Sequence, residues 1–206
     1  MALLSFLARL FRKGTPPETA EVLFFGLGNK GSSYAFTRHN IGYRIADALA
    51  ERLESRTNGC FAEAGYIQGT LFESRKKVLV VKPYTFMNRS GGAVESYIAQ
   101  NRCPRSNILV MVDDYNLPLG RLRIRRNGSD GGHNGLKSII ALIGGNFPRL
   151  RIGIGPLPGG TAGIDFVLGS FTDAEEKGLK EVIPRAVDAC VLFAQNGTEA
   201  VMNTIN

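Results

Sequence analysis

Apolar and polar residues follow two different periods along this chain. Short apolar runs or strict alternation predict strands, and apolar residues spaced three or four apart predict helices. The predicted strands are 21–26, 64–72, 77–82, 107–112, 121–126 and 150–155. The predicted helices lie near 40–55, 87–101, 134–143 and 173–195. Because strands and helices alternate along the chain, we expect an α/β fold.

The predicted strands differ in how much of each is buried. The runs VLVV and ILVMV are apolar throughout, which is typical of interior strands covered on both faces. The run RLRIRR alternates sharply and predicts a strand with one basic, exposed side. The segment Pro156 to Ile164 is rich in Gly and Pro and follows a strand, so we expect a mobile loop there.

The first residues form a pattern of their own. Leu3, Leu7 and Leu10 share one helical face, and Gly14 to Pro17 breaks the pattern. We therefore treat residues 1–20 as an N-terminal appendage and linker, and favour packing against the domain over contact with a membrane surface. Residues 21–206 are expected to form one domain. No apolar run reaches the 18 or so residues that a membrane-spanning helix needs, so no stable membrane association is expected.

The net charge and the cysteine content limit which classes of partner and which cellular compartment we expect for the protein. The 25 Lys and Arg residues exceed the 18 Asp and Glu residues, and the net charge of +7 favours a polyanionic partner. Charge alone leaves nucleic acid binding undecided, because many basic proteins never contact it. The three cysteines are odd in number and have no metal-ligand spacing, which fits a reducing cytoplasm and predicts neither a disulfide framework nor a zinc site.

The stretch FFGLGNKG matches the spacing G-x-G-x-x-G after an apolar run. A dinucleotide site requires the helix to begin within this motif and an acidic residue to end the second strand. Here the periodicity of Ile41, Ile45, Leu49 and Leu53 begins too late, and no suitable acid follows. We therefore expect the glycines to serve a tight turn, with Asn29 projecting at the end of a strand, where ligands bind in open α/β sheets.

The two histidines indicate acid–base chemistry. His39 in TRHN and His133 in GGHN each precede an asparagine at a predicted helix start, where an imidazole tends to stay neutral and able to act as a base. Such a base needs an orienting partner, and Asp113 stands where the buried run ILVMV ends. Asp114 competes for that role. Capping of the strand end or of the following turn explains the acidic pair equally well.

Two further asparagines accompany Asn29. Asn88 lies just inside the start of the helix after VLVV, and Asn134 holds the equivalent place after GGH. Asparagine at such positions often caps a helix, yet convergent carboxamides also hold a peptide backbone or an oxyanion. No serine or cysteine lies in a recognisable nucleophile motif. The set therefore favours a carbonyl substrate attacked by water.

These residues carry a resemblance to a known family. The blocks GLGNKGSSYAFTRHNIG, KPYTFMNRSGGAV, DDYNLPLGRLRIR, GGHNGLKSI, FPRLRIGIG and FVLGSF stand in the order and approximate spacing of the bacterial-type peptidyl-tRNA hydrolases. The chain resembles that family over about residues 21–206. The resemblance implies a monomeric, cytoplasmic, single-domain α/β protein with a mixed twisted sheet flanked by helices. It also implies hydrolysis of the ester between peptide and tRNA, which releases tRNA for reuse in translation, without a metal or other cofactor.

The resemblance also assigns roles to individual residues. By position, His39 corresponds to the histidine that activates water and Asp113 to the aspartate that orients it. Asn29, Asn88 and Asn134 correspond to the asparagines that hold the ester and its developing oxyanion. The resemblance further implies that the cleft is lined by Tyr34, Met87 and His133. It also implies that tRNA phosphate is contacted by Arg125 and Arg151.

The chain departs from the family pattern at three places. Lys30 stands where the family commonly has proline in N-P-G, Asn116 stands where a second acid is frequent, and Ser129-Asp130 replaces a small or apolar pair. An alternative is a non-catalytic RNA-binding relative, since plastid intron-splicing factors resemble the same family. The presence of the histidine, the aspartate and all three asparagines argues against that alternative. A hydrolase for a small ester or amide is disfavoured by the arginine-rich strand.

Overall fold

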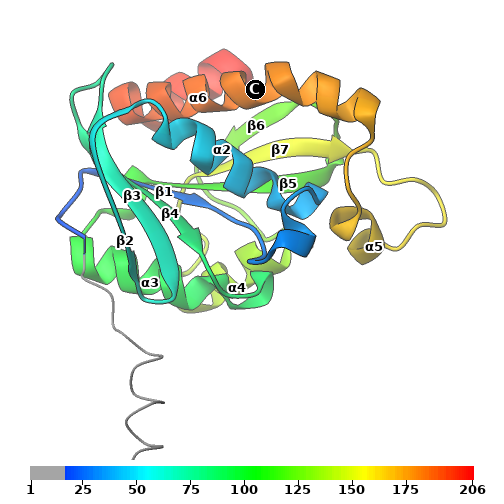
Figure 1. Cartoon of the computed structure of the whole chain (residues 1–206), viewed down its shortest axis with the longest axis horizontal. Coiled ribbons are helices and arrows are strands. Elements are labelled where there is room, and N and C mark those ends of the chain that lie inside the picture. The colour runs from blue at the N-terminus through cyan, green and yellow to red at the C-terminus, as the bar shows by residue number, and fades with distance from the viewer. Residues whose placement is uncertain (1–16) are drawn as a thin grey trace, which may run out of the picture.

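The computed structural model describes residues 17–206, which form one mixed sheet of seven strands in the order β2-β3-β4-β1-β5-β7-β6 (Figure 1). The strands are β1 Val22–Gly26, β2 Leu53–Phe61, β3 Ala64–Leu71, β4 Lys77–Pro83, β5 Ile108–Pro118, β6 Leu122–Arg125 and β7 Arg149–Gly155. The helices are α2 Ile41–Ala50, α3 Ser90–Asn101, α4 Asn134–Ile143, α5 Gly163–Leu168 and α6 Asp173–Ile205. Four short 3-10 turns are η1 Ser32–Tyr34, η2 Arg38–Asn40, η3 Met87–Arg89 and η4 Arg105–Asn107.

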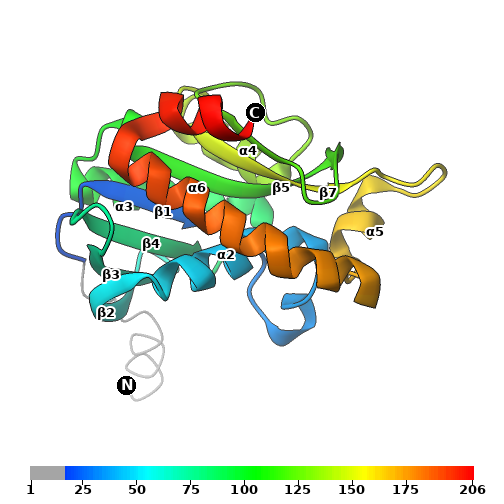
Figure 2. The ribbon, with the colours of Figure 1, turned by 90° about the horizontal axis from the view of Figure 1, so that it is seen from above.

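Strands β4, β1, β5 and β7 run parallel, and β2, β3 and β6 pair antiparallel at the two edges. Helices α2 and α6 cover one face of the sheet and α3 and α4 cover the other (Figures 1 and 2). Alternate residues of β1 supply both cores: Val22 and Phe24 pack toward α2 and α6, and Leu23 and Phe25 toward α3 and α4. This two-sided burial explains the continuous apolar runs and confirms the predicted α/β class.

The sequence pattern missed β2. Leu53 fits the period of the preceding helix, but α2 ends at Ala50 and Leu53 is the first residue of β2. The strand is an edge strand, paired only with β3, and most of its side chains are exposed. An exposed edge strand has no buried face to impose apolar alternation, so its sequence carries no strand signal.

The C-terminal elements also differ from the pattern. The predicted loop 156–164 has no regular structure until Gly163, where α5 begins, so its last two residues belong to a helix. Helix α6 extends to Ile205, well past the predicted end near 195. It continues across Gly197, whose φ of 78° interrupts the helical geometry. A glycine adopts this left-handed conformation without strain, so the chain can kink and resume the helix.

The glycines of FFGLGNKG serve mainly close packing, which corrects the expectation of a tight turn. A Cβ on Gly26 would overlap the carbonyl oxygen of Gly42, so α2 lies directly against β1. Gly31, with a φ of 121°, is the one member of the motif in the left-handed region. Helix α2 begins only at Ile41, after two intervening 3-10 turns, and not within the glycine motif as a dinucleotide site requires.

The predicted appendage, residues 1–20, lies mostly outside the described residues. Its last part is attached to the domain, because the Glu18 amide donates to Gln68 and the Ala20 amide donates to Asn101, at 3.0 and 2.9 Å. Within residues 17–206, no helix combines the length and the apolarity needed to cross a membrane.

Candidate active site

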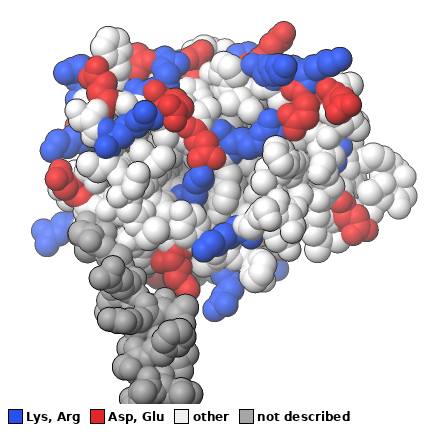
Figure 3. Space-filling model, viewed as in Figure 1, with Lys and Arg blue, Asp and Glu red and all other residues white. Residues whose placement is uncertain are grey.

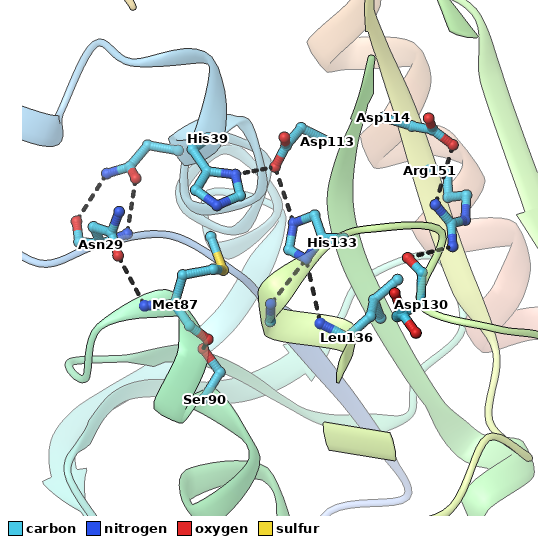
Figure 4. Close-up of polar contacts among 12 residues, drawn as sticks. Asn29, His39, Met87, Ser90, Asp113, Asp114, Asp130, His133, Leu136 and Arg151 are labelled. Carbon is cyan, nitrogen blue, oxygen red and sulfur yellow. Dashed lines mark hydrogen bonds and ion pairs between the residues drawn. The ribbon is translucent and has the colours of Figure 1, made fainter. Parts of the chain in front are cut away.

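His39 and Asp113 meet at the carboxyl ends of the parallel strands, near the middle of the sheet. The turn η2 presents His39, and β5 carries Asp113 as a buried residue in its second half. Histidine Nδ1 lies 2.8 Å from Asp113 Oδ1 (Figure 4). An ionised carboxylate only accepts hydrogen bonds, so Nδ1 carries the proton. The other ring nitrogen, Nε2, is then unprotonated in the neutral ring and free to act as a base.

His133 is a second donor to the same carboxylate oxygen. It caps the start of α4, where its Nδ1 accepts hydrogen bonds from the amides of Gly135 and Leu136 at 3.1 and 3.2 Å. Its proton therefore lies on Nε2, which donates to Asp113 Oδ1 at 3.1 Å. Burial acts to raise the pKa of Asp113, but the two imidazoles beside it hold that pKa well below its usual range. The carboxylate thus stays ionised and holds each ring in a single tautomer, with the proton on Nδ1 of His39 and on Nε2 of His133.

His39, Asp113 and His133 also offer three potential metal-ligand atoms within 4.8 Å of one another. A metal on His133 Nε2 would require the ring proton to move to Nδ1. That nitrogen faces two backbone N–H groups, which can only donate. The donor set of His133 therefore does not fit a metal site, and the same contacts fit the hydrogen-bonded arrangement.

Asn29 follows β1 and presents its amide in a fixed orientation. Its Oδ1 accepts from the Met87 backbone amide at 2.8 Å, which leaves Nδ2 as the free donor side of the group. The main chain of Asn29 is held by Asn40, whose Oδ1 accepts from the Asn29 amide and whose Nδ2 donates to the Asn29 carbonyl, at 2.8 and 2.9 Å. A donor held this firmly meets the requirement for stabilising an oxyanion without reorganisation.

Asn40 and Arg38 flank His39 in TRHN, and their supporting roles were not predicted from the sequence. Arg38 is buried, donates to both carboxylate oxygens of Glu175 at 3.2 and 2.8 Å, and donates to the Ser170 carbonyl. Its guanidinium carbon also lies 4.5 Å from the centre of the Phe166 ring in α5. Arg38 therefore ties the His39 segment to α5 and α6. The available signal was the position of an arginine directly before the candidate base in TRHN, but its burial is known only from the structure.

Most of the predicted site residues line one open cleft of about 350 Å³. They are Asn29, Tyr34, His39, Met87, Asn88, Asp113, His133, Asn134 and Arg151. Arg125 is the exception and lies outside the cleft. Further large side chains of the lining were not named as site residues from the sequence: Phe86, Tyr115 and, in α5, Ile164, Val167 and Leu168. These side chains add apolar surface to the lining of the cleft.

The structure shows which member of the acidic pair orients a histidine, a choice that the sequence left open. Asp113 contacts both imidazoles, whereas Asp114 accepts from the Asn116 amide at 2.9 Å and pairs with Arg151 at 3.1 Å. Asp114 thus has the turn-capping role. Arg151 also donates to the carbonyls of Ser129 and Asp130, so it anchors the loop before His133. Its contact with phosphate stays a prediction, and little of its side chain is exposed.

Comparison with known proteins places this geometry in a family. A family model described as peptidyl-tRNA hydrolase matches residues 23–206. A peptidyl-tRNA hydrolase of Synechococcus sp. (strain JA-3-3Ab) is 43% identical over 93% of this chain and 85% of its own length. The chain belongs to the peptidyl-tRNA hydrolase family. The one from Fervidobacterium nodosum is 40% identical over 90% of this chain and 96% of its own length.

A solved structure agrees with the sequence comparison. The crystal structure of peptidyl-tRNA hydrolase from Acinetobacter baumannii is 34% identical, covers 92% of this chain and 97% of its own, and has a TM-score of 0.83. The resemblance to peptidyl-tRNA hydrolases and the mixed-sheet fold that it implied are therefore confirmed.

Two of the three departures from the family pattern, at Lys30 and at Asp130, make local side-chain contacts in this member. The Lys30 ammonium lies 4.7 Å from the centre of the Tyr84 ring. At position 116 it is the backbone N–H that donates to Asp114, a contact that does not depend on which side chain stands there. Asp130 accepts from the Gly132 amide at 2.8 Å, which shapes the loop before His133.

Proposed function

We propose that the chain hydrolyses the ester between the peptide and the 3′-terminal ribose of peptidyl-tRNA, the activity named by its family. The observation that carries this proposal is the pairing of His39, with Nε2 free, and the donor side of Asn29 in one cleft. We further propose that it acts in the cytoplasm, as a monomer, and without a metal or other cofactor.

The reaction needs a base and a set of donors. His39 Nε2 removes a proton from water as the water oxygen attacks the ester carbonyl, and the Asp113 carboxylate stabilises the imidazolium that forms. Asn29, with Asn88 and Asn134 from the lining of the same cleft, donates to the carbonyl oxygen as it becomes negative. When the ester C–O bond breaks, the imidazolium returns its proton to the ribose oxygen. The products are the free peptide acid and tRNA.

The distribution of charge supports RNA binding beside the cleft. On the face in Figure 3, basic and acidic side chains intermingle, so the excess positive charge does not gather there. The excess positive charge gathers on β6 and β7, where Arg123 lies opposite Arg151 and Arg125 lies opposite Arg149 in the strand register. These arginines line a hollow of about 320 Å³. Like charges directly opposite on neighbouring strands are destabilising, so an RNA phosphate is the natural counterion for the exposed members.

Cleavage of N-acetyl-aminoacyl-tRNA in the presence of EDTA tests the proposed activity. We expect the protein, treated with EDTA and desalted, to release N-acetyl-amino acid and tRNA at the same rate as untreated protein. Loss of activity that returns with added metal would overturn metal independence. Tight RNA binding without any turnover would instead support the splicing-factor alternative.

Replacing Arg125 by alanine tests the RNA surface. Arg125 is exposed on β6, so we expect Arg125→Ala to weaken tRNA binding and to flatten the slope of log K against log salt by about one. Arg75→Ala is the matched control, because Arg75 is an exposed arginine in the turn between β3 and β4, near the opposite edge of the sheet. Salt-dependent binding measurements giving the same slope for both variants would remove Arg125 from the RNA surface.

A further inference from the structure

A second, smaller pocket adjoins the active-site cleft. It has a volume of about 300 Å³, and Phe86 lines both the pocket and the cleft. The remaining lining residues are Lys30, Glu63, Tyr84, Thr85 and Arg89. The pocket therefore offers two cationic side chains within reach of a substrate that occupies the cleft.

The Lys30 side chain is held in place by an aromatic ring. Its ammonium lies 4.7 Å from the centre of the Tyr84 ring, a cation–π contact. The Tyr84 ring in turn rests on β3, because any Cβ at Gly65 would overlap the Tyr84 hydroxyl. The ammonium is thus positioned at the pocket before any ligand arrives, which lowers the entropy lost on binding.

Arg89 is a cation at an electrostatically unfavourable place. It is the residue that immediately precedes α3, where the partial positive charge of the helix N-terminus disfavours a cation. No carboxylate in residues 17–206 lies within 4.0 Å of the charged group of Arg89 or of Lys30, so Glu63 pairs with neither. Residues 1–16 contain no Asp or Glu. The two cations therefore line the pocket without a direct ion pair, and Glu63 is the one carboxylate in the described lining.

The lining also contains a hydrogen-bond donor without a partner. Thr85 Oγ1 is buried and has no hydrogen bond to any described residue. A buried hydroxyl left without a partner is costly, and it becomes a further donor to an anion in this pocket only if rotation about χ1 turns Oγ1 toward the pocket. The geometry points to an anion-binding subsite, for which we propose the side-chain carboxylate of an acidic residue in the peptide part of the substrate as the ligand. This inference rests on the proposed function.

The order of the strands favours the peptide over RNA as the occupant. The pocket lies beyond the end of β4, Asn29 and His39 follow β1, Asp113 lies in β5, and the arginine hollow lies on β7 and β6. In the sheet order β4-β1-β5-β7-β6, the two basic features thus flank the cleft on opposite sides. A substrate whose RNA occupies the arginine side and whose ester lies at His39 directs its peptide toward Lys30 and Arg89.

Matched substrates test the subsite. We would compare kcat/KM for N-acetyl-peptidyl-tRNAs that carry either Glu or Gln at the first, second or third residue from the ester. At one of these positions we expect the wild-type protein to prefer Glu by about 3- to 10-fold, the size expected for two partly exposed charge pairs. In the Lys30→Gln/Arg89→Gln variant, the preference should fall to about one, with the Gln substrate cleaved as before.

The control is Lys177→Gln/Lys180→Gln, which removes the same charge from exposed positions on α6 and should keep the preference. Equal cleavage of Glu and Gln substrates by the wild-type protein at every position would refute the subsite and leave the hydrolase function standing. An equal loss on both substrates, with a flatter salt dependence, would assign the pocket to RNA phosphate and overturn the peptide proposal. Failure of the wild-type protein to cleave even the Gln substrates would overturn the proposed function and the subsite with it.

Discussion

His39→Ala is expected to lower kcat for peptidyl-tRNA hydrolysis by about 10²- to 10⁴-fold, the range that a general base contributes. The described structure places a free imidazole nitrogen in the cleft at His39 alone, because the Nδ1 of His133 already accepts two backbone amides and its Nε2 donates to Asp113. No second base of this kind is available to replace it. Steady-state kinetics on N-acetyl-aminoacyl-tRNA would measure the loss.

His39→Gln is the matched variant for this prediction. Its amide can still donate to Asp113, which needs donors around its buried charge, but it cannot accept a proton from water. We expect a loss of kcat similar to that of His39→Ala, with tRNA affinity and the thermal unfolding temperature closer to wild type. If either variant turned over within tenfold of the wild-type protein, His39 could not be the base.

Asn29→Asp is expected to lower kcat by about 10²- to 10³-fold, the loss typical of one oxyanion donor. The substitution keeps the shape of the side chain and the oxygen that accepts from the Met87 amide. It replaces the Nδ2 donor with a negatively charged oxygen, which would repel the oxyanion that forms during attack on the ester. The effect should therefore appear in kcat more than in KM.

Asn58→Asp provides the control for the added charge, because Asn58 is an exposed amide on the edge strand β2. We expect its kinetics to match the wild-type protein. A normal kcat with a raised KM in Asn29→Asp would instead assign Asn29 to binding that is equally strong in the ground state and the transition state.

Local signals in the sequence were reliable where burial imposed them. The runs in β1, β4 and β5 are apolar because both faces of these strands are covered, so their periodicity was readable. The alternation in β6 was readable because only one face of that strand is buried: Leu122 and Ile124 are buried while Arg125 is exposed. Strand β2 lies at the sheet edge and helix α5 is short, so neither has enough buried surface to leave a pattern.

The site shows the same division between local and tertiary information. TRHN and GGHN identified the two histidines, but their different tasks depend on contacts across the fold. His133 is fixed by the amides at the start of α4, and His39 by Asp113, which lies 74 positions away along the chain. The choice between Asp113 and Asp114 likewise required the structure, because adjacent residues of a strand point to opposite faces.

The amino-acid sequence by itself determined the α/β class, the family resemblance and the candidate residues, since these follow from periodicity and from motifs of neighbouring residues. The tertiary structure alone decided which nitrogen of each histidine carries the proton, that Arg151 anchors a loop, and that Lys30 and Arg89 share a pocket. Protonation and pairing depend on distances of a few ångströms between residues far apart in the chain, and only the packing of strands and helices sets those distances.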